Sequence, residues 1–316
     1  MTWSLAIHGG AGLIRRDPGP AERYAPARAA LNRALDAGAE LLTRGAPALD
    51  AVCAAVRVME DAPCFNAGRG GVLAADGTVQ CDASVMRGAD RATGALAAVR
   101  GIANPILGAR EVMAHSPHVL LAGHDAEAWL RARGLATRAP DWFITPERAE
   151  HLARAQRAGR TALDHDLEDN ATGTVGAVAR DVAGSLAAAT STGGMTNKLP
   201  GRVGDSALVG AGTWACDSTV AVSATGEGER FIQAHLAGRM HDLMDLLGLS
   251  LQDAATRALQ VDLRRVGGRG GLIAVDAQGR IGLPFITAGM YRGWATSVGP
   301  RGVGIWPEDG SPWPIG

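Results

Sequence analysis

The stretch TSTGGMTNKLPGRVGDS, residues 190–206, carries the most information about the fold and chemistry of this chain. Its glycines and proline predict a loop. Arg202 and Asp205 stand three residues apart, separated by Gly204, and two interpretations remain open. In the first, the charges pair with each other, which on a surface contributes about 0–1 kcal/mol. In the second, they bind an amino-acid head group, because a guanidinium holds a carboxylate bidentately and a carboxylate holds an ammonium.

The overall composition is that of a globular protein. The 316 residues are 47% hydrophobic and 20% charged, and such a length forms one large domain or two. The balance of 31 basic against 32 acidic residues argues against a surface for nucleic acid or anionic membranes. The 43 glycines follow no three-residue period, so they indicate tight turns and close backbone approaches.

The cysteines and the N-terminus indicate a cytoplasmic protein. The four cysteines form no C-x-x-C pair in a chain that is long and not cysteine-rich, which is typical of buried thiols in a reducing compartment. The start, MTWSLAIHGG, has no basic segment and too short an apolar run for a signal peptide. No stretch approaches the ~20 apolar residues that span a bilayer. We therefore expect a soluble, cytoplasmic protein with no membrane partner.

Hydrophobic periodicity predicts helices in pairs and strands in hairpins. Apolar residues at helical spacing predict consecutive amphipathic helices around residues 31–42 and 49–59. Helix starts are expected at Asn104-Pro105, Thr145-Pro146 and Ser250. Turn residues predict strand pairs at 72–79, 175–190 and 272–283, and a strand at 4–7 that enters a glycine turn at 8–12. Hairpins and paired helices favour antiparallel sheets over a doubly wound parallel sheet.

Three shorter motifs suggest other chemistry. HGGAG at 8–12 is similar to the HGGG oxyanion turn of α/β-hydrolase esterases, but the chain has no G-x-S-x-G nucleophile elbow. GAGTWA at 210–215 fits a dinucleotide-binding turn without the strand–turn–helix unit around it. His115, His118 and His124 lack an H-E-x-x-H helix or a suitably spaced carboxylate, which disfavours a transition-metal site.

Eight segments together make the chain resemble the plant-type L-asparaginases, also called isoaspartyl (β-aspartyl) peptidases, of the N-terminal nucleophile (Ntn) hydrolase superfamily. They occur in the order found in that family, span nearly the whole chain, and include the highly specific run 190–206. The segments are HGGAG (8–12), FNAGRG (65–70), ANPIL (103–107), SPHVLL (116–121), GTVGAVA (173–179), TSTGGMTNKLPGRVGDS (190–206), SATGEGE (223–229) and GMYR (289–292). The resemblance implies an α/β (α+β) fold in one domain, 1–316: a four-layer αββα sandwich of two mainly antiparallel sheets between helices.

The resemblance also implies that the chain cuts itself between Gly173 and Thr174. Cleavage would give an α-subunit, 1–173, ending in the polar segment 154–173, and a β-subunit, 174–316. A hydroxyl is a poor nucleophile without a neighbouring base. Once N-terminal, Thr174 would carry its own base, an α-amine with an intrinsic pKa of about 7.7–8.0. Glycine at 173 suits the cut because a residue without Cβ can adopt strained backbone conformations.

The remaining site residues follow by position in the family motifs. Thr192 is expected to hydrogen-bond the nucleophile, and Asn66 to reach the same surroundings. Thr225 and Gly226 would form the oxyanion hole. By the same resemblance, Arg202 and Asp205 would hold the substrate's α-carboxylate and α-ammonium, and Gly228 would contact that head group through its backbone.

A structural sodium ion is the one bound ion that the resemblance implies. Its ligands would be backbone carbonyls in the segment MEDAPCFNAGR, those of Met59, Glu60, Ala62, Phe65, Ala67 and Arg69. Arg69 replaces the apolar residue expected in close relatives, which could alter the neighbouring pocket wall. No catalytic metal or redox cofactor is expected.

The sequence thus predicts an enzyme that hydrolyses L-asparagine and β-aspartyl dipeptides to L-aspartate through an acyl-enzyme on Thr174. The family assembles as a dimer of αβ units, a heterotetramer, and we expect the same here. One alternative is a glycosylasparaginase of the same superfamily, which the intact NKLPGRVGDS loop and the missing secretion signal disfavour. The others are an HGGAG-based esterase and a catalytically silent binding protein that retains Arg202 and Asp205.

Overall fold

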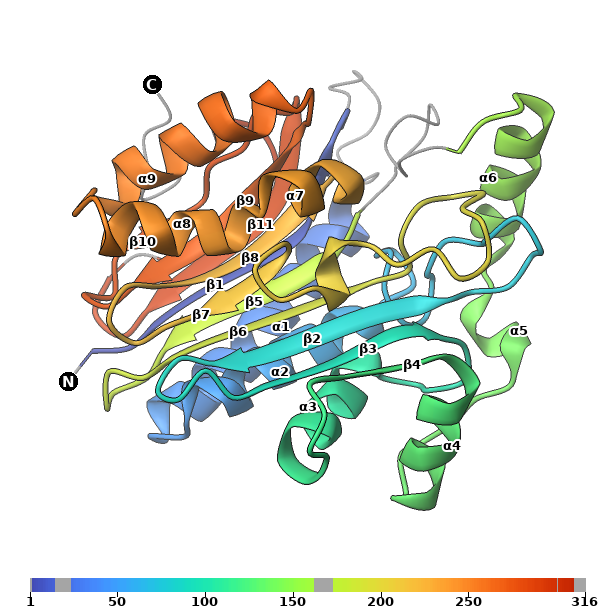
Figure 1. The fold of residues 1–316 in the computed structure, drawn as a ribbon, viewed down its shortest axis with the longest axis horizontal. Helices are drawn as coiled ribbons and strands as arrows, with labels where there is room; N and C mark the ends of the chain where they lie inside the picture. The colour runs from blue at the N-terminus through green and yellow to red at the C-terminus, as the bar shows by residue number, and fades with distance from the viewer. Residues whose placement is uncertain (1, 15–23, 162–172, 300, 310–316) are drawn as a thin grey trace.

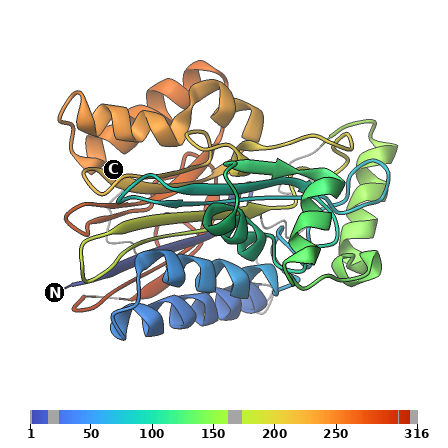
Figure 2. The ribbon, with the colours of Figure 1, turned by 60° about the horizontal axis from the view of Figure 1, so that its bottom comes forward.

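The computed structural model describes residues 2–14, 24–161, 173–299 and 301–309. Two sheets stack face to face between layers of helices, so the predicted four-layer αββα sandwich is confirmed (Figures 1 and 2). Part of the expected α-subunit tail, residues 162–172, lies outside the described residues. Within the described residues, no helix is both long and apolar enough to cross a membrane.

The larger sheet has eight strands, and the smaller has four. In spatial order, the larger sheet runs β12 (Gly302–Gly304), β11 (Gly289–Thr296), β1 (Ser4–Gly12), β5 (Val175–Arg180), β6 (Leu186–Thr192), β2 (Cys81–Arg87), β3 (Thr93–Val99) and β4 (Leu120–Ala122). The smaller runs β10 (Ile281–Gly282), β9 (Gly270–Asp276), β8 (Val220–Gly226) and β7 (Thr213–Ala215). Only the β3–β4 pair within these sheets is parallel, as the hairpins of the sequence predict.

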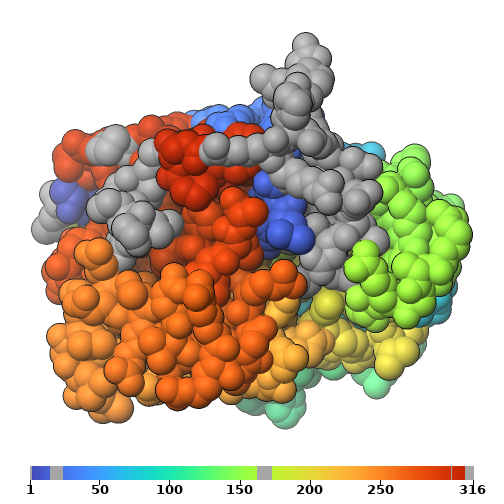
Figure 3. All heavy atoms as spheres, turned by 90° about the horizontal axis from the view of Figure 1, so that it is seen from above, coloured from blue at the N-terminus to red at the C-terminus, as the bar shows by residue number. Residues whose placement is uncertain are grey.

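The helices cover the outer faces of the two sheets. The layer on the larger sheet is formed by α1 (Ala25–Thr43), α2 (Ala48–Glu60) and α3 (Pro105–His115), with α4 (Gly123–Ala132) beside β3 and β4. The layer on the smaller sheet is formed by α7 (Gly228–Ala234), α8 (Leu236–Asp245), α9 (Leu251–Arg257) and a π-helical turn, η4 (Ala258–Leu263). Two further helices, α5 (Pro140–Phe143) and α6 (Pro146–Arg157), lie at one end (Figure 1). Seen from above, α6 in green and the orange layer α7–α9 occupy different parts of one face (Figure 3).

Burial on both faces explains the small side chains of the central strands. Leu5 and Ile7 of β1 pack toward the helices, whereas Ala6 packs against the smaller sheet. The same alternation places Ala177 toward the helices and Val178 between the sheets, because successive side chains of a strand point to opposite faces. Residues of even number in β5, β6 and β2 therefore face the smaller sheet, as do those of β1 up to His8; beyond the register shift of β1 it is Ala11 that packs between the sheets.

Most local predictions are confirmed, and two need correction. The helices around 31–42 and 49–59 are α1 and α2, and Thr145 and Ser250 accept N-cap hydrogen bonds from Arg148 N and Asp253 N. The expected glycine turn at 8–12 is instead the second half of β1, where the pairing with β11 shifts register between His8 and Gly10. The pair expected at 72–79 is reduced to one bridge, Leu73 to Val79.

Candidate active site

Thr174 precedes β5 and faces the end of β6. Its Oγ1 donates a hydrogen bond to Thr192 Oγ1 at 3.0 Å, and Thr192 Oγ1 also accepts from Gly194 N at 2.9 Å. The β5–β6 register, with Val175 opposite Ser191, holds the two threonines together. Both side chains are buried. The structure therefore juxtaposes the nucleophile and the tuning residue that the sequence predicts.

The HGGAG segment of β1 packs against the bond between Gly173 and Thr174. A Cβ on Gly10, whose φ is +113°, would lie 2.1 Å from Gly173 N. Only glycine fits this combination of positive φ and close approach. Ala11 N donates to Thr225 Oγ1 at 3.3 Å, so the segment also contacts the predicted oxyanion residue. Its glycines thus serve close packing at Gly173, which differs from the esterase turn considered above.

One pocket joins this nucleophile to the predicted head-group residues. Its lining consists of Thr174, Thr192, Gly194, Met195, Arg202, Asp205, Gly226 and Gly228. Six of these eight residues were predicted from the sequence. They come from the residue before β5, the end of β6 and the segment after it, the end of β8 and the start of α7, so only the folded chain brings them together.

Arg202 and Asp205 do not form the mutual ion pair that was the simpler interpretation. The Arg202 guanidinium instead donates from Nε and Nη2 to the two carboxylate oxygens of Glu229, each at 2.8 Å. Asp205 Oδ2 is buried and has no hydrogen-bond partner within the described part of the chain. Such an atom is costly unless a ligand satisfies it. The pocket residue Gly228 lies beside the other carboxylate oxygen, Oδ1, whereas Oδ2 lies beside Gly212.

Glycines keep the space between these charged groups open. A Cβ on Gly228 would lie 2.8 Å from both Arg202 Nη2 and Asp205 Oδ1. A Cβ on Gly204 would lie 2.9 Å from Arg202 Nη1, and one on Gly194 3.2 Å from the same atom. Three side chains that would obstruct the guanidinium and the carboxylate are therefore absent.

The ionisation of Asp205 is shifted into the physiological range. Burial raises the pKa of its carboxyl to about 7, although the nearby positive charge of Arg202 acts to lower it. A perturbed carboxyl in a pocket is a common mark of a functional site. Asp205 can consequently exchange between a neutral and a charged form close to neutral pH.

Asn66 and Thr225 lie behind the pocket wall. Asn66 Nδ2 donates to Gly194 O at 2.8 Å, and its Oδ1 accepts from Val72 N at 2.9 Å. Asn66 therefore braces the backbone next to Thr192, while its direct contact with the nucleophile stays a prediction. Thr225 is buried at the end of β8, immediately before the pocket residue Gly226.

The predicted sodium loop turns tightly on itself. Glu60 O accepts from Arg69 N at 2.9 Å, and a Cβ on Gly68 would lie 2.8 Å from the same oxygen. Met59 O and Ala62 O also accept backbone hydrogen bonds, and a carbonyl oxygen can hold a second partner. The exposed Arg69 guanidinium lies 5.6 Å from the Trp142 ring centroid and is absent from the pocket lining, so its side chain leaves the pocket wall unchanged.

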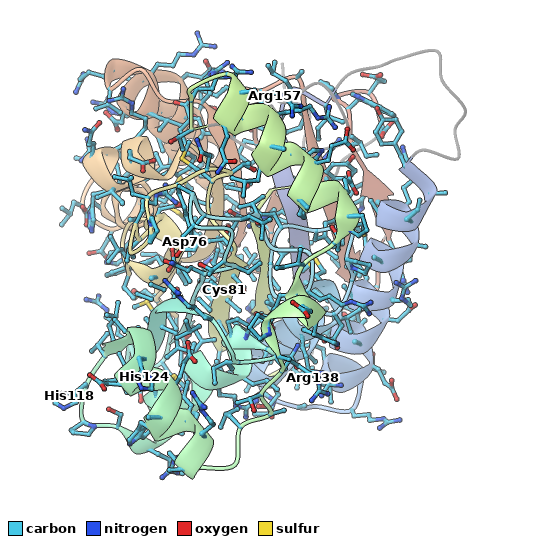
Figure 4. The ribbon with its side chains drawn as sticks, turned by 90° about the vertical axis from the view of Figure 1, so that its right-hand side faces the viewer. Asp76, Cys81, His118, His124, Arg138 and Arg157 are labelled. Carbon is cyan, nitrogen blue, oxygen red and sulfur yellow. The ribbon has the colours of Figure 1, made fainter. Side chains whose placement is uncertain are left out.

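His118 lies just before β4 and His124 lies in the first turn of α4, and both residues are exposed (Figure 4). Across the described residues, no group of three His, Cys, Asp or Glu side chains is arranged to hold a metal ion. All four cysteines are without a disulfide, and three of them are buried.

Two functional candidates were missed by sequence reasoning. Glu229 was visible in the SATGEGE motif, but its partner Arg202 lies 27 residues away in the chain. His8 was quoted within HGGAG without a role. It is fully buried, with Nδ1 3.0 Å from Thr174 O and Nε2 2.9 Å from Ser223 Oγ. Burial lowers the pKa of the His8 imidazole to about 3, so the ring is neutral near pH 7.

The αββα sandwich is consistent with the fold of the Ntn-hydrolase class. A family model described as Asparaginase matches residues 1–305. The chain belongs to this asparaginase family.

Relatives in this family cover almost the whole chain. The isoaspartyl peptidase of Salmonella typhimurium is 50% identical over 308 residues, covering 96% of this chain and 98% of the relative. The isoaspartyl peptidase of Escherichia coli is 48% identical over 310 residues, covering 97% of each. The plant-type L-asparaginase of Pyrobaculum calidifontis is 42% identical over 298 residues, covering 92% of this chain and 96% of the relative.

Proposed function

We propose that this chain is an autoprocessing threonine hydrolase that cleaves L-asparagine and β-aspartyl dipeptides and releases L-aspartate. One observation carries the proposal: a single pocket has the Thr174–Thr192 hydroxyl pair at one end and Arg202 with Asp205 at the other. The names of the relatives, isoaspartyl peptidase and plant-type L-asparaginase, support the same substrate class.

The first step is cleavage of the chain between Gly173 and Thr174. The Thr174 hydroxyl attacks the carbonyl carbon of Gly173, and the C–N bond breaks to give an ester. This bond cleavage frees the α-amine of Thr174, and water then hydrolyses the ester to give the Gly173 carboxylate and restore the Thr174 hydroxyl. The products are an α-subunit, 1–173, and a β-subunit, 174–316. The close packing of Gly10 against Gly173 supports this step, because it restricts the backbone at the bond to be cut.

The second step is acyl transfer from the substrate. The Thr174 α-amine accepts the hydroxyl proton while Oγ1 attacks the β-carbonyl carbon of the substrate. Thr225 Oγ1 and Gly226 N would donate hydrogen bonds to the developing oxyanion. The amine then gives its proton to the leaving nitrogen, and ammonia or an amino acid departs. Water attacks the acyl-enzyme, releases L-aspartate and restores the hydroxyl.

The charged end of the pocket selects an α-amino acid head group. The α-ammonium of the substrate would bind the Asp205 carboxylate, whose Oδ1 lies beside Gly228 in the pocket lining. The Arg202 guanidinium would bind the α-carboxylate, with Nη1 facing the space left by Gly194 and Gly204. Holding both groups places the β-carbonyl rather than the α-carbonyl at Thr174.

We also propose the structural sodium ion and the dimer of αβ units. The carbonyls of Met59, Glu60, Ala62, Phe65, Ala67 and Arg69 would hold the ion, which would stabilise the loop that carries Asn66. Replacing sodium with choline in the buffer should then lower the melting temperature. Native mass spectrometry of the processed enzyme should give two copies of each subunit.

Intact-mass analysis tests the central proposal. Wild-type chain should yield two fragments that meet at Gly173 and Thr174, and these should hydrolyse both asparagine and a β-aspartyl dipeptide. Thr174→Ala should remain one inactive chain, whereas Thr161→Ala, at an exposed threonine of the described α-subunit, should cleave normally. Wild-type chain that stays intact and yet hydrolyses asparagine would contradict the mechanism.

A further inference from the structure

Six polar contacts form a continuous buried chain between two backbone carbonyls. From Thr174 O it passes to His8 Nδ1 at 3.0 Å, and from His8 Nε2 to Ser223 Oγ at 2.9 Å. It continues to Thr190 Oγ1 at 2.7 Å and to Thr213 Oγ1 at 2.6 Å. Ser84 Oγ is 2.8 Å from Thr213 Oγ1 and 2.7 Å from Ser206 O. The chain therefore connects the nucleophile's carbonyl to the residue after Asp205.

The strand registers create this chain. His8, Gly176, Thr190 and Ser84 occupy adjacent positions across β1, β5, β6 and β2 of the larger sheet. Ser223 and Thr213 are partners on β8 and β7 of the smaller sheet. The contacts alternate between the two sheets, so the hydroxyls form a polar row inside an otherwise apolar interface.

Gly176 supplies the space for the histidine in this row. A Cβ at this position would lie 2.0 Å from Ser223 Oγ and 2.4 Å from His8 Nε2. Because no side chain separates His8 from Thr190 across β5, Ser223 can contact both. Gly176, the second glycine of the GTVGAVA segment, is thus needed for the His8–Ser223 contact.

Hydrogen-bond counting favours the Nδ1–H tautomer of His8, because Thr174 O can only accept. The carbonyls at both ends only accept hydrogen bonds, whereas a neutral imidazole and four hydroxyls donate one hydrogen each. Five hydrogens serve six contacts, so one contact lacks a hydrogen. Thr190 Oγ1 also lies 3.4 Å from Gly212 O, a longer contact. In one arrangement each hydroxyl donates toward His8, so Ser223 donates to Nε2 and the imidazole donates from Nδ1 to Thr174 O. The contact without a hydrogen is then the one between Ser84 Oγ and Ser206 O, farthest from Thr174.

We propose that His8 is a positioning residue for Thr174, held in the Nδ1–H tautomer by the hydroxyls of Ser223 and Thr190. This inference rests on the proposed function. The hydrogen bond from His8 restricts rotation of the Thr174 carbonyl, and the same residue carries both reacting groups, the hydroxyl and the α-amine. Fixing the carbonyl fixes the direction in which those groups point.

Steady-state kinetics on Ser223→Ala tests the role of His8. We expect kcat per cleaved chain to fall about 10- to 100-fold, because a misplaced nucleophile slows chemistry, while KM changes less than about twofold. Thr190→Val, which removes only the hydroxyl, should lower kcat in the same direction by a smaller factor. Thr219→Val is the matched control, because Thr219 Oγ1 contacts His241 Nδ1 at 2.7 Å in a second buried pair. Equal kcat values for Ser223→Ala and Thr219→Val would refute the proposal.

Nitrogen-15 spectra of histidine provide a readout that does not depend on turnover. They are recorded on the uncut Thr174→Ala chain, which keeps the carbonyl of residue 174, and His8 is assigned by the signal lost in His8→Asn. A hydrogen on Nδ1 and none on Nε2 at pH 7 supports the proposal, and so does the appearance of the Nε2–H form in Ser223→Ala. An Nε2–H form in the chain with Ser223 intact would overturn it.

The substitution pair His8→Asn and His8→Leu separates hydrogen bonding from packing. The Asn amide can donate near the position of Nδ1, so His8→Asn should retain more kcat than His8→Leu. The opposite order contradicts the proposal. If wild-type chain neither cleaves nor hydrolyses β-aspartyl amides, the proposed function itself fails, whereas an active wild type with unaffected Ser223→Ala refutes only the role of His8.

Discussion

The two ends of the pocket are built from different kinds of side chain. At the proposed nucleophile, neutral hydroxyls of Thr174 and Thr192 are buried and held by paired strands. At the other end, Arg202 lies on a loop and Asp205 begins a short 3-10 helix, Asp205–Ala207, and Arg202 is paired to the half-exposed Glu229. Neutral groups fixed by sheet register suit chemistry that tolerates little displacement, whereas charges on a loop suit recognition of a zwitterion. The difference predicts that changes at the first end alter kcat and changes at the second alter KM.

Removing the proposed oxyanion donor should have the largest effect of the substitutions that permit cleavage. Thr225→Val should lower kcat about 10²- to 10³-fold, because one oxyanion donor typically contributes that much, with little change in KM. Thr225→Ser keeps the hydroxyl and should remain within about tenfold of wild type. The test is steady-state kinetics on the cleaved fraction. A change confined to KM would show that Thr225 acts in substrate binding and not as an oxyanion donor.

Arg202→Ala should act mainly on affinity. Losing a partner in a buried charged contact costs about 2–5 kcal/mol, so KM should rise on the order of 100-fold while cleavage at Thr174 proceeds. Arg202→Lys retains the charge without the bidentate geometry, so its KM should lie between those of the wild type and Arg202→Ala. If Arg202→Ala abolishes cleavage and leaves KM unchanged in any cleaved fraction, the assignment of Arg202 is wrong.

Affinity for the product, L-aspartate, should depend on pH through Asp205. Because burial raises the pKa of this carboxyl to about 7, it is increasingly protonated below pH 7 and cannot pair with an ammonium. Calorimetry should show the dissociation constant of L-aspartate rising about tenfold for each pH unit below 7. Asp205→Asn should bind weakly with a flat pH profile, and a wild-type profile equally flat between pH 5.5 and 7 would exclude this role.

Glu229→Gln should have the smallest effect. The pair with Arg202 is about half exposed on the Glu229 side, and such pairs contribute about 0–1 kcal/mol. KM should rise two- to fivefold because the guanidinium is held less firmly. Glu227→Gln is the matched control, since Glu227 pairs with Arg269 outside the pocket lining and should leave KM unchanged. A fall in kcat without a rise in KM would contradict the expectation that changes at the charged end of the pocket alter KM.

Much of the architecture could be predicted because local patterns encode it. Apolar periodicity located α1 and α2, and the turn residues located the β5–β6 and β9–β10 hairpins. The HGGAG segment was wrongly expected to be a turn, because paired glycines signal a turn locally. Its neighbours β11 and β5 keep it extended through inter-strand hydrogen bonds, and glycine was needed for contact with Gly173.

The site was predicted residue by residue through motif resemblance, but its contacts were not. The His8–Ser223 contact spans 215 positions in the chain, and isolated Ser and Thr residues carry no signal of such a partner. Likewise, spacing left open whether Arg202 pairs with Asp205 or binds a ligand, and it gave no sign of Glu229, which accepts from two guanidinium nitrogens.

The sequence alone determined the layered architecture, the family and six of the eight residues that line the pocket, because periodicity and motifs are properties of neighbouring positions. Only the tertiary structure decided that Arg202 pairs with Glu229, that Asp205 Oδ2 has no hydrogen-bond partner within the described residues, and that a row of hydroxyls joins the two sheets behind Thr174. Those contacts depend on strand register and sheet stacking, which bring together atoms that no local pattern connects.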